Sequence, residues 1–244
     1  MPVILISIFN QAYILTFTLN RTLANTQGQL INLAHNSLIQ NITNNSKNIN
    51  LTKSFFIFSM NIMFATSIVM GIVTYLFYEL LLSFWLEYSQ NFEINAIINY
   101  ELIKLILIYT IIYNLWKSAT IFVTSINKHE QLSRIYIVYS FLLAITIFLA
   151  IFYGDIYIML KSMIILETIL LIYILKMVVQ RVLSVSLSNL IKNMLFNLIP
   201  LTISVLIMYL FNVQIAFMII IVVYGIYIYV SIKVNEDIYR KFLR

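Results

Sequence analysis

Residues 54–79 read SFFIFSMNIMFATSIVMGIVTYLFYE, and this stretch decides the fold class. No charged residue occurs in it before Glu79. About 20 consecutive apolar residues are enough for a helix to cross the hydrocarbon core of a bilayer. We therefore predict that residues 54–79 form a transmembrane helix.

Further apolar runs follow, separated by polar or turn-forming residues, at 101–126, 135–153, 156–179, 194–211 and 213–232. The 244-residue chain is 62% hydrophobic and 10% charged, and its mean hydropathy is +0.95. Soluble globular chains are about 45–50% apolar and about 25% charged. The composition excludes an ordinary soluble domain and predicts an all-α, polytopic transmembrane helical bundle.

The residue content also excludes several kinds of site. The chain has no cysteine, which rules out disulfides, thiolate zinc sites, iron–sulfur ligation and a cysteine nucleophile. Its two histidines argue against a histidine-rich metal site. Neither HExxH, GxSxG nor a phosphate-binding glycine loop occurs. We therefore expect neither a metal nor a cofactor.

The net charge of +6 has a topological explanation. If successive spans alternate direction, the basic residues of 44–53, 127–134, 180–193 and the C-terminus share one side of the membrane. The opposite side then carries mainly carboxylates, which are Glu79, Glu87, Glu93, Glu101 and Asp155. Loops rich in Lys and Arg face the cytoplasm. We expect a cytoplasmic C-terminus, and no nucleic-acid partner is needed to explain the charge.

Polar residues recur with helical periodicity near the N-terminus. At 100° per residue, one arc of about 100° on a helix over 16–46 holds Arg21, Asn25, Gln29, Asn32, Asn36, Gln40 and Thr43. An amphipathic helix on the membrane surface is the alternative, but such a helix normally carries Lys and Arg on its polar face. Neutral amides instead favour a helix that lines a cavity and binds hydroxyl-rich cargo.

A second polar face lies on the span 101–126, where it comprises Thr110, Asn114, Lys117, Ser118, Thr124 and Ser125. Lys117 is the most informative residue, because an ionisable group deep in a span indicates a functional site by default. The alternative is an ion pair that only locks two helices together. Glu167, midway along 156–179, is the candidate partner in either case.

Two groups of residues resemble a known family. Asn20-Arg21-Thr22-Leu23, Gln29-Leu30-Ile31-Asn32-Leu33 and Asn36-Ser37 are similar to a helix of O-antigen and polysaccharide flippases, and Leu115-Trp116-Lys117-Ser118 before Asn127-Lys128 also fits. These flippases belong to the multidrug/oligosaccharidyl-lipid/polysaccharide exporter superfamily. The resemblance covers about 13–180. The chain departs from the family at residues 39–43, where many members have proline and charged residues.

The resemblance implies the second helical bundle of a two-bundle flippase plus an extra C-terminal helix pair. Residues 1–15 would be a remnant of a preceding transmembrane helix, 16–179 the bundle, 180–193 a cytoplasmic linker, 194–232 the helix pair and 233–244 a cytoplasmic tail. We expect a C-terminal fragment of a longer transporter. A split half, or a half that associates with a second copy, is the alternative. The expected location is the bacterial inner membrane.

The function that the resemblance implies is translocation of lipid-linked oligosaccharide units for O-antigen or another surface polysaccharide, by alternating access. Arg21 and Lys117 would attract pyrophosphate or acidic sugar, and Glu167 would couple a proton or sodium ion. Sugar hydroxyls would bind the amides of Asn25, Gln29, Asn32, Asn36 and Asn114. The expected partners are lipid-linked oligosaccharide, membrane lipid, and the missing half or a second copy.

No chemical step is required for flipping, so we expect no enzyme. One alternative is a membrane polymerase or a glycosyl or acyl transferase of the same pathway. Its catalytic groups would need an extramembrane loop, and the loop 87–100 has carboxylates but no His, Arg or Lys. The other alternative is a multidrug-type exporter, which would need an apolar, aromatic cavity with a carboxylate.

Overall fold

The computed structural model describes residues 16–26, 28–29, 48–87, 98–125, 129–196, 222–226, 229 and 233. Within these residues every regular element is helical and no strand occurs. The prediction of an all-α helical bundle is confirmed. Of the residues predicted to bind cargo, Asn32 and Asn36 lie outside the described part of the chain, as do most of the predicted spans 194–211 and 213–232.

Four of the described helices are long and apolar enough to cross a membrane. They are α3 (Ile49–Leu76), α6 (Tyr100–Ser125), α7 (His129–Tyr153) and α8 (Ile156–Ile174). A π-helix, η1 (Leu175–Val182), continues α8, and two shorter helices are α4 (Tyr78–Glu87) and α9 (Leu187–Phe196). Residues 16–26 are also helical. Because four of the described helices are long and apolar enough to cross a membrane, the chain is a membrane protein.

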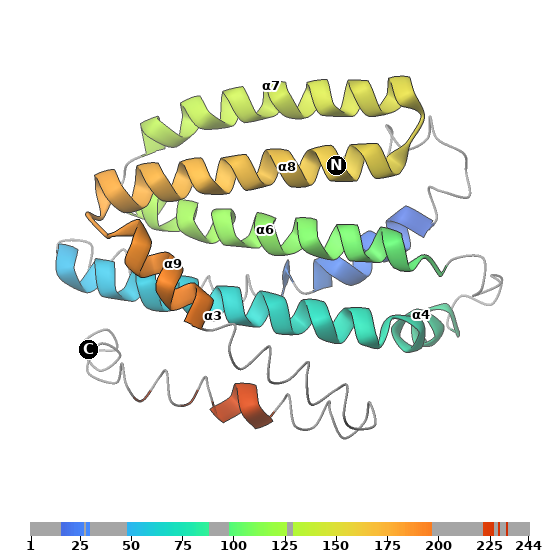
Figure 1. Cartoon of the computed structure of the whole chain (residues 1–244), viewed down its shortest axis with the longest axis horizontal. Helices are drawn as coiled ribbons and strands as arrows, with labels where there is room; N and C mark the ends of the chain where they lie inside the picture. Colours follow the sequence, from blue (N-terminus) through green and yellow to red (C-terminus); the bar gives the residue numbers. More distant parts are fainter. Residues whose placement is uncertain are drawn as a thin grey trace.

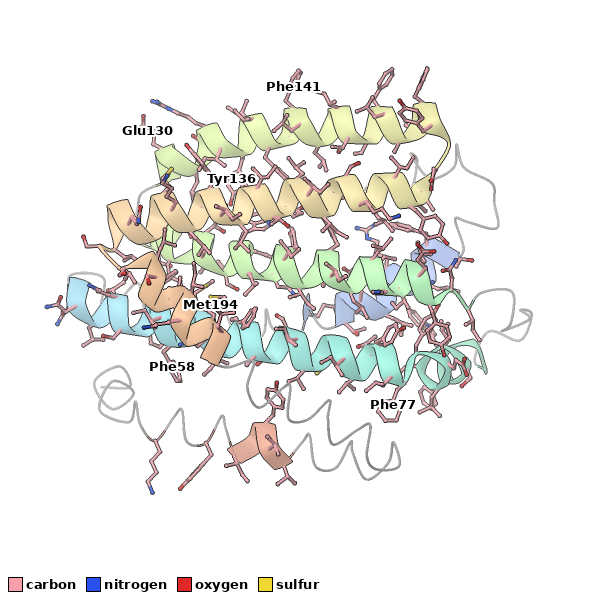
Figure 2. All side chains as sticks on the ribbon, viewed as in Figure 1. Phe58, Phe77, Glu130, Tyr136, Phe141 and Met194 are labelled. Carbon is pink, nitrogen blue, oxygen red and sulfur yellow. The ribbon has the colours of Figure 1, made fainter. Side chains whose placement is uncertain are left out.

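Helix α6 lies at the centre of the bundle. It packs against α3 on one side and against α8 on the other, while α7 packs mainly against α8 (Figure 1). Most of the apolar residues of α6 are buried, among them Ile103, Ile106 and Phe122. By contrast, α7 leaves large apolar side chains uncovered, and Phe141, which is 68% exposed, points away from the bundle (Figure 2). In a membrane, this face of α7 contacts lipid.

Side-chain caps fix where three of the long helices begin. Asn48 Oδ1 accepts a hydrogen bond from Leu51 N (3.3 Å), and Asn99 Oδ1 accepts one from Leu102 N (2.9 Å). Asp155 Oδ1 accepts from Tyr157 N (2.7 Å) and so caps α8. Gly154, at φ +64°, makes the reversal between α7 and α8, which a residue with a Cβ would adopt only with strain. The break predicted at Gly154-Asp155 is therefore a tight helical hairpin.

Charged residues segregate to the two ends of the bundle. The basic residues Lys53, Arg134 and Lys176 lie where α3 and α7 begin and α8 ends, and Lys53 Nζ donates to Ser184 O across that end (3.0 Å). Glu79 and Asp155 lie at the opposite end (Figure 1). This arrangement follows from alternating helix directions; which end faces the cytoplasm remains a prediction.

Two helix boundaries differ from the sequence expectation. The predicted turn 127–134 is helical from His129, and the carboxylate of Glu130 in the first turn suits the positive end of the helix dipole. The span expected to reach Glu79 ends at Leu76, after which Phe77 forms a turn and α4 starts. The second boundary divides the expected segment between α3 and the separate helix α4.

Candidate functional site

A cavity of about 440 Å³ lies between the N-terminal segment 16–29 and helices α6, α7 and α8. Its volume is in the range of small-molecule sites, about 300–1,000 Å³. The described residues that line it include Arg21, Asn25, Gln29, Tyr109, Thr110, Tyr113, Asn114, Lys117 and Tyr139, with apolar residues such as Phe17 and Met163 between them. The wall of the cavity thus combines polar and apolar side chains.

One wall of the cavity is a single face of α6. Residues 106, 110, 113, 114 and 117 recur at intervals of three or four, the spacing at which helical side chains share a face. The hydroxyl of Thr110 donates to Ile106 O (2.8 Å) and is satisfied by its own helix. The polar groups that α6 leaves to the cavity are therefore mainly those of Asn114, Lys117 and the tyrosines.

The facing wall comes from the N-terminal segment. Arg21, Asn25 and Gln29 are four residues apart and all line the cavity. Arg21 interacts electrostatically with Tyr109 of α6. A Cβ at Gly28 would lie 3.5 Å from Oδ1 of Asn114, so this segment lies in direct contact with α6. The described part of the first predicted polar face therefore shares this space with Thr110, Asn114 and Lys117 of the second.

Lys117 is held by an aromatic ring and not by a carboxylate. Its Nζ lies 5.6 Å from the ring centroid of Tyr113, which is a cation–π distance. Among the described residues its ammonium makes no ion pair, and the expected pair with Glu167 does not form. The positive charge of Lys117 is therefore available to a ligand in the cavity.

Asn114 adds a second unsatisfied group. Its side chain is only 4% exposed, and in the described part of the chain its Nδ2 has no hydrogen-bond partner. Most buried polar atoms in native proteins are hydrogen-bonded, so an orphan of this kind needs an explanation. Asn114 also lines the cavity, so this amide lies beside the space that a ligand would occupy.

Glu167 lies outside the cavity in a cluster that joins three helices. Its carboxylate is fully buried and accepts hydrogen bonds from Trp116 Nε1 of α6 and from Tyr139 Oη of α7 (2.5 Å). Trp116 also makes an edge contact with Tyr113, with ring centroids 5.1 Å apart. Tyr139 lines the cavity on one side and binds Glu167 on the other, so it separates the carboxylate from the cations.

The structure brings five of the seven predicted cargo-binding residues into one cavity, namely Arg21, Asn25, Gln29, Asn114 and Lys117. The remaining two lie outside the described residues. Ser118, Thr124 and Ser125, also on the predicted polar face of α6, instead donate to backbone carbonyls of their own helix. These hydroxyls are hydrogen-bonded within α6, and the three residues do not line the cavity.

Sequence reasoning did not assign the cavity tyrosines to the site. Tyr109 and Tyr113 are four residues apart on α6, and their rings stack with centroids 6.1 Å apart. That spacing, in register with Thr110 and Lys117, was the available signal. The assembled cavity offers two cations, three amides and three tyrosines, and this set suits an anionic ligand that carries hydroxyl groups.

Comparison of the chain with protein-family models, with curated proteins and with solved structures gave no match.

Proposed function

We propose that the chain moves lipid-linked oligosaccharide units for a surface polysaccharide across the bacterial inner membrane, and that the cavity receives their polar head. The observation that carries this proposal is the convergence of Arg21 and Lys117 with three amides in one cavity of a membrane helix bundle. Ionisable residues within membrane spans mark substrate or ion pathways. Flipping requires no bond to be made or broken, so the proposed activity is transport.

Each part of the head group has a matching set of side chains. Arg21 and Lys117 provide charge-assisted hydrogen bonds to a pyrophosphate or an acidic sugar. The amides of Asn25, Gln29 and Asn114 both donate and accept, as hydroxyl groups do. The orphan Nδ2 of Asn114 is the amide group that gains most from such a ligand.

Both alternatives account less well for the cavity. A multidrug-type exporter for cationic compounds needs a carboxylate in contact with its substrate, whereas Glu167 is shielded behind Tyr139. A polymerase or transferase needs a general acid or base near its substrate. None of the described lining residues is Asp, Glu or His. The cation and amide lining therefore favours transport of an anionic, hydroxylated cargo.

Glu167 is proposed as the site that couples a proton or sodium ion to transport. It is the carboxylate at the core of the described bundle, and Tyr139 connects it to the cavity wall. Ligand contacts with Tyr139 would be transmitted to Glu167 through one hydrogen bond. This places the coupling residue beside the cargo without direct contact between them.

A binding measurement tests the proposal. The full chain in lipid nanodiscs is titrated with an undecaprenyl-pyrophosphate-linked monosaccharide, with undecaprenol as the reference. Lys117→Ala should weaken binding of the pyrophosphate lipid about tenfold or more, since one hydrogen bond to a charged group contributes ~1.5–3 kcal/mol. Lys104→Ala is the matched control, because Lys104 is exposed on the same helix and does not line the cavity.

Two results would contradict the proposal. One is equal affinity for the pyrophosphate lipid and undecaprenol, and the other is an equal loss in Lys104→Ala and Lys117→Ala. Translocation itself is measured in vesicles by the fraction of a fluorescent lipid-linked sugar that an impermeant quencher reaches. The wild-type chain should raise that fraction with time, and Lys117→Ala should not.

A further inference from the structure

A second hollow, of about 570 Å³, runs between α7 and α8 on the membrane-facing surface. Its walls are mainly apolar and exposed, with Val138 and Leu142 on α7 and Ile169 and Tyr173 on α8. All four lie within helices that can span the membrane. A ligand in this groove would therefore contact apolar side chains at the depth of the lipid acyl chains.

The groove has the depth of one leaflet. On α7 it extends from Arg134 to Leu142. At ~1.5 Å of rise per residue this is about 12 Å, close to half of a hydrocarbon core that is ~30 Å thick. A single acyl chain would thus lie along the groove from the head-group level to near the bilayer centre.

The end of the groove at the head-group level is basic. Arg134 lines that end, and Lys176 is exposed where α8 passes into η1. Arg134 Nη2 pairs with Glu130 Oε1 at 3.1 Å, but the two side chains are 80% and 84% exposed, respectively. Exposed pairs of this kind contribute little, so a lipid phosphate can compete for the guanidinium.

No described segment of the chain covers the groove. Residues 222–226 lie beyond α3, on the opposite side of the bundle from α7 (Figure 1). Tyr139 lines both the groove and the polar cavity, so the two spaces share one side chain as a wall. On its cavity side Tyr139 adjoins polar residues, whereas on its groove side it adjoins apolar residues.

We propose that the α7–α8 groove binds an anionic phospholipid from the leaflet on the Arg134 side, with one acyl chain along the groove and the phosphate at Arg134. The depth of the groove, its apolar walls and its basic end all match such a lipid. This site is independent of the transported cargo, and it places a membrane lipid against the residue that forms the cavity wall.

The absence of cysteine from the chain allows a direct test. Ile169→Cys lies in the groove and Ile172→Cys, on the same helix, does not; the native side chains are 58% and 61% exposed. Each variant is labelled with benzophenone maleimide, reconstituted in vesicles of equimolar phosphatidylglycerol and phosphatidylcholine, and irradiated. Mass spectrometry then gives the ratio of the two lipid adducts at each position.

At residue 169 we expect phosphatidylglycerol adducts to exceed phosphatidylcholine adducts about fivefold, which corresponds to about 1 kcal/mol for one arginine near an anionic lipid. At residue 172 we expect a ratio near one. Arg134→Ala in the Ile169→Cys chain should abolish the preference, and Glu130→Gln should increase it. Val138→Cys and Ile137→Cys form a second matched pair on α7 if either first variant fails to fold.

Three outcomes would overturn the proposal. They are the absence of head-group preference at residue 169, an equal preference at residues 169 and 172, and a protein–protein adduct as the main product at residue 169. The third outcome would assign the groove to a second copy of the chain. Failure here leaves the cargo-binding measurement unaffected, because that measurement uses Lys117 and a different ligand.

Discussion

The polar cavity and the Glu167 cluster lie on neighbouring faces of α6. They differ in whether their polar groups have hydrogen-bond or ion-pair partners within the protein. In the cluster, a fully buried carboxylate receives hydrogen bonds from Trp116 and Tyr139. In the cavity, Lys117 makes no ion pair among the described residues, and the Nδ2 of Asn114 has no partner there. Adjacent residues, Trp116 and Lys117, divide these two roles because successive helical side chains point about 100° apart.

The difference separates two uses of polarity within a membrane bundle. A polar group whose partners all belong to the protein holds helices together, whereas a group without partners leaves its interactions to a ligand. Mutations should therefore reduce stability in the cluster and ligand affinity in the cavity. Each prediction below tests this division.

The largest effect is expected at Glu167. Glu167→Ala leaves the donors of Trp116 and Tyr139 without an acceptor, so we expect a loss of about 4 kcal/mol in the free energy of unfolding. Glu167→Gln keeps an acceptor oxygen and should lose less than half of this. Thermal unfolding in mild detergent measures both. An unchanged melting temperature in Glu167→Ala would show that the cluster does not stabilise the bundle.

A smaller loss, of about 1.5 kcal/mol, is expected for Tyr139→Phe, because one hydrogen bond to Glu167 disappears while the ring remains. Tyr136→Phe is the matched control: Tyr136 lies on the same helix against Trp116, with ring centroids 6.2 Å apart. Chemical denaturation compares the two variants with the wild type. Equal losses in both would mean that the hydrogen bond of Tyr139 to Glu167 contributes no more than the hydroxyl of Tyr136 does.

In the cavity, removing a polar group should raise the free energy of unfolding instead of lowering it. Asn114→Leu removes an unsatisfied buried amide and keeps the branched shape of the side chain, so we expect the unfolding free energy to rise by about 1 kcal/mol. Affinity for the pyrophosphate lipid should fall at the same time. Thr110→Val, which loses a hydroxyl already bonded to Ile106 O, should give no such gain. A destabilised Asn114→Leu would place this residue with the cluster.

The smallest effect concerns Tyr78, at the start of α4 and outside the four spans. Burial raises the pKa of its hydroxyl, against the opposing hydrogen bond from the Asn99 backbone. The neutral form is therefore favoured in the folded state. Stability from this group is present below the ordinary tyrosine pKa of about 10 and is lost as the pH rises through the folded pKa.

Thermal unfolding between pH 9 and 11 measures this dependence. The melting temperature of the wild type should fall over the interval, and that of Tyr78→Phe should fall less steeply. Parallel curves would show that other groups account for all of the alkaline instability.

The fold class could be predicted because hydropathy is a property of short segments and needs no knowledge of neighbours. Helix boundaries were less accessible. Helix α7 begins at His129, in a stretch whose polarity alone suggested a loop, with Glu130 in its first turn. The break at Gly154-Asp155 was evident, since glycine and an N-cap residue occur together there.

The site was predictable in part for a related reason. Periodicity gives the direction in which Arg21 and Lys117 point around their own helices, and the structure directs both into one cavity. Periodicity does not identify which helix lies opposite each of these faces. The candidate Lys117–Glu167 pair does not form, because Trp116 and Tyr139 supply donors to Glu167 from two other helices. Such a cluster becomes visible only when the helices are packed.

The position of Trp116 has a practical consequence. The chain has two tryptophans, and Trp85 lies at the far end of the bundle in α4. With Trp85→Phe, all indole emission comes from a ring whose nitrogen donates to Glu167 and whose neighbour in the chain is Lys117. The molecule thus contains an intrinsic fluorophore between its two polar regions, and its spectrum reports on both without any added dye.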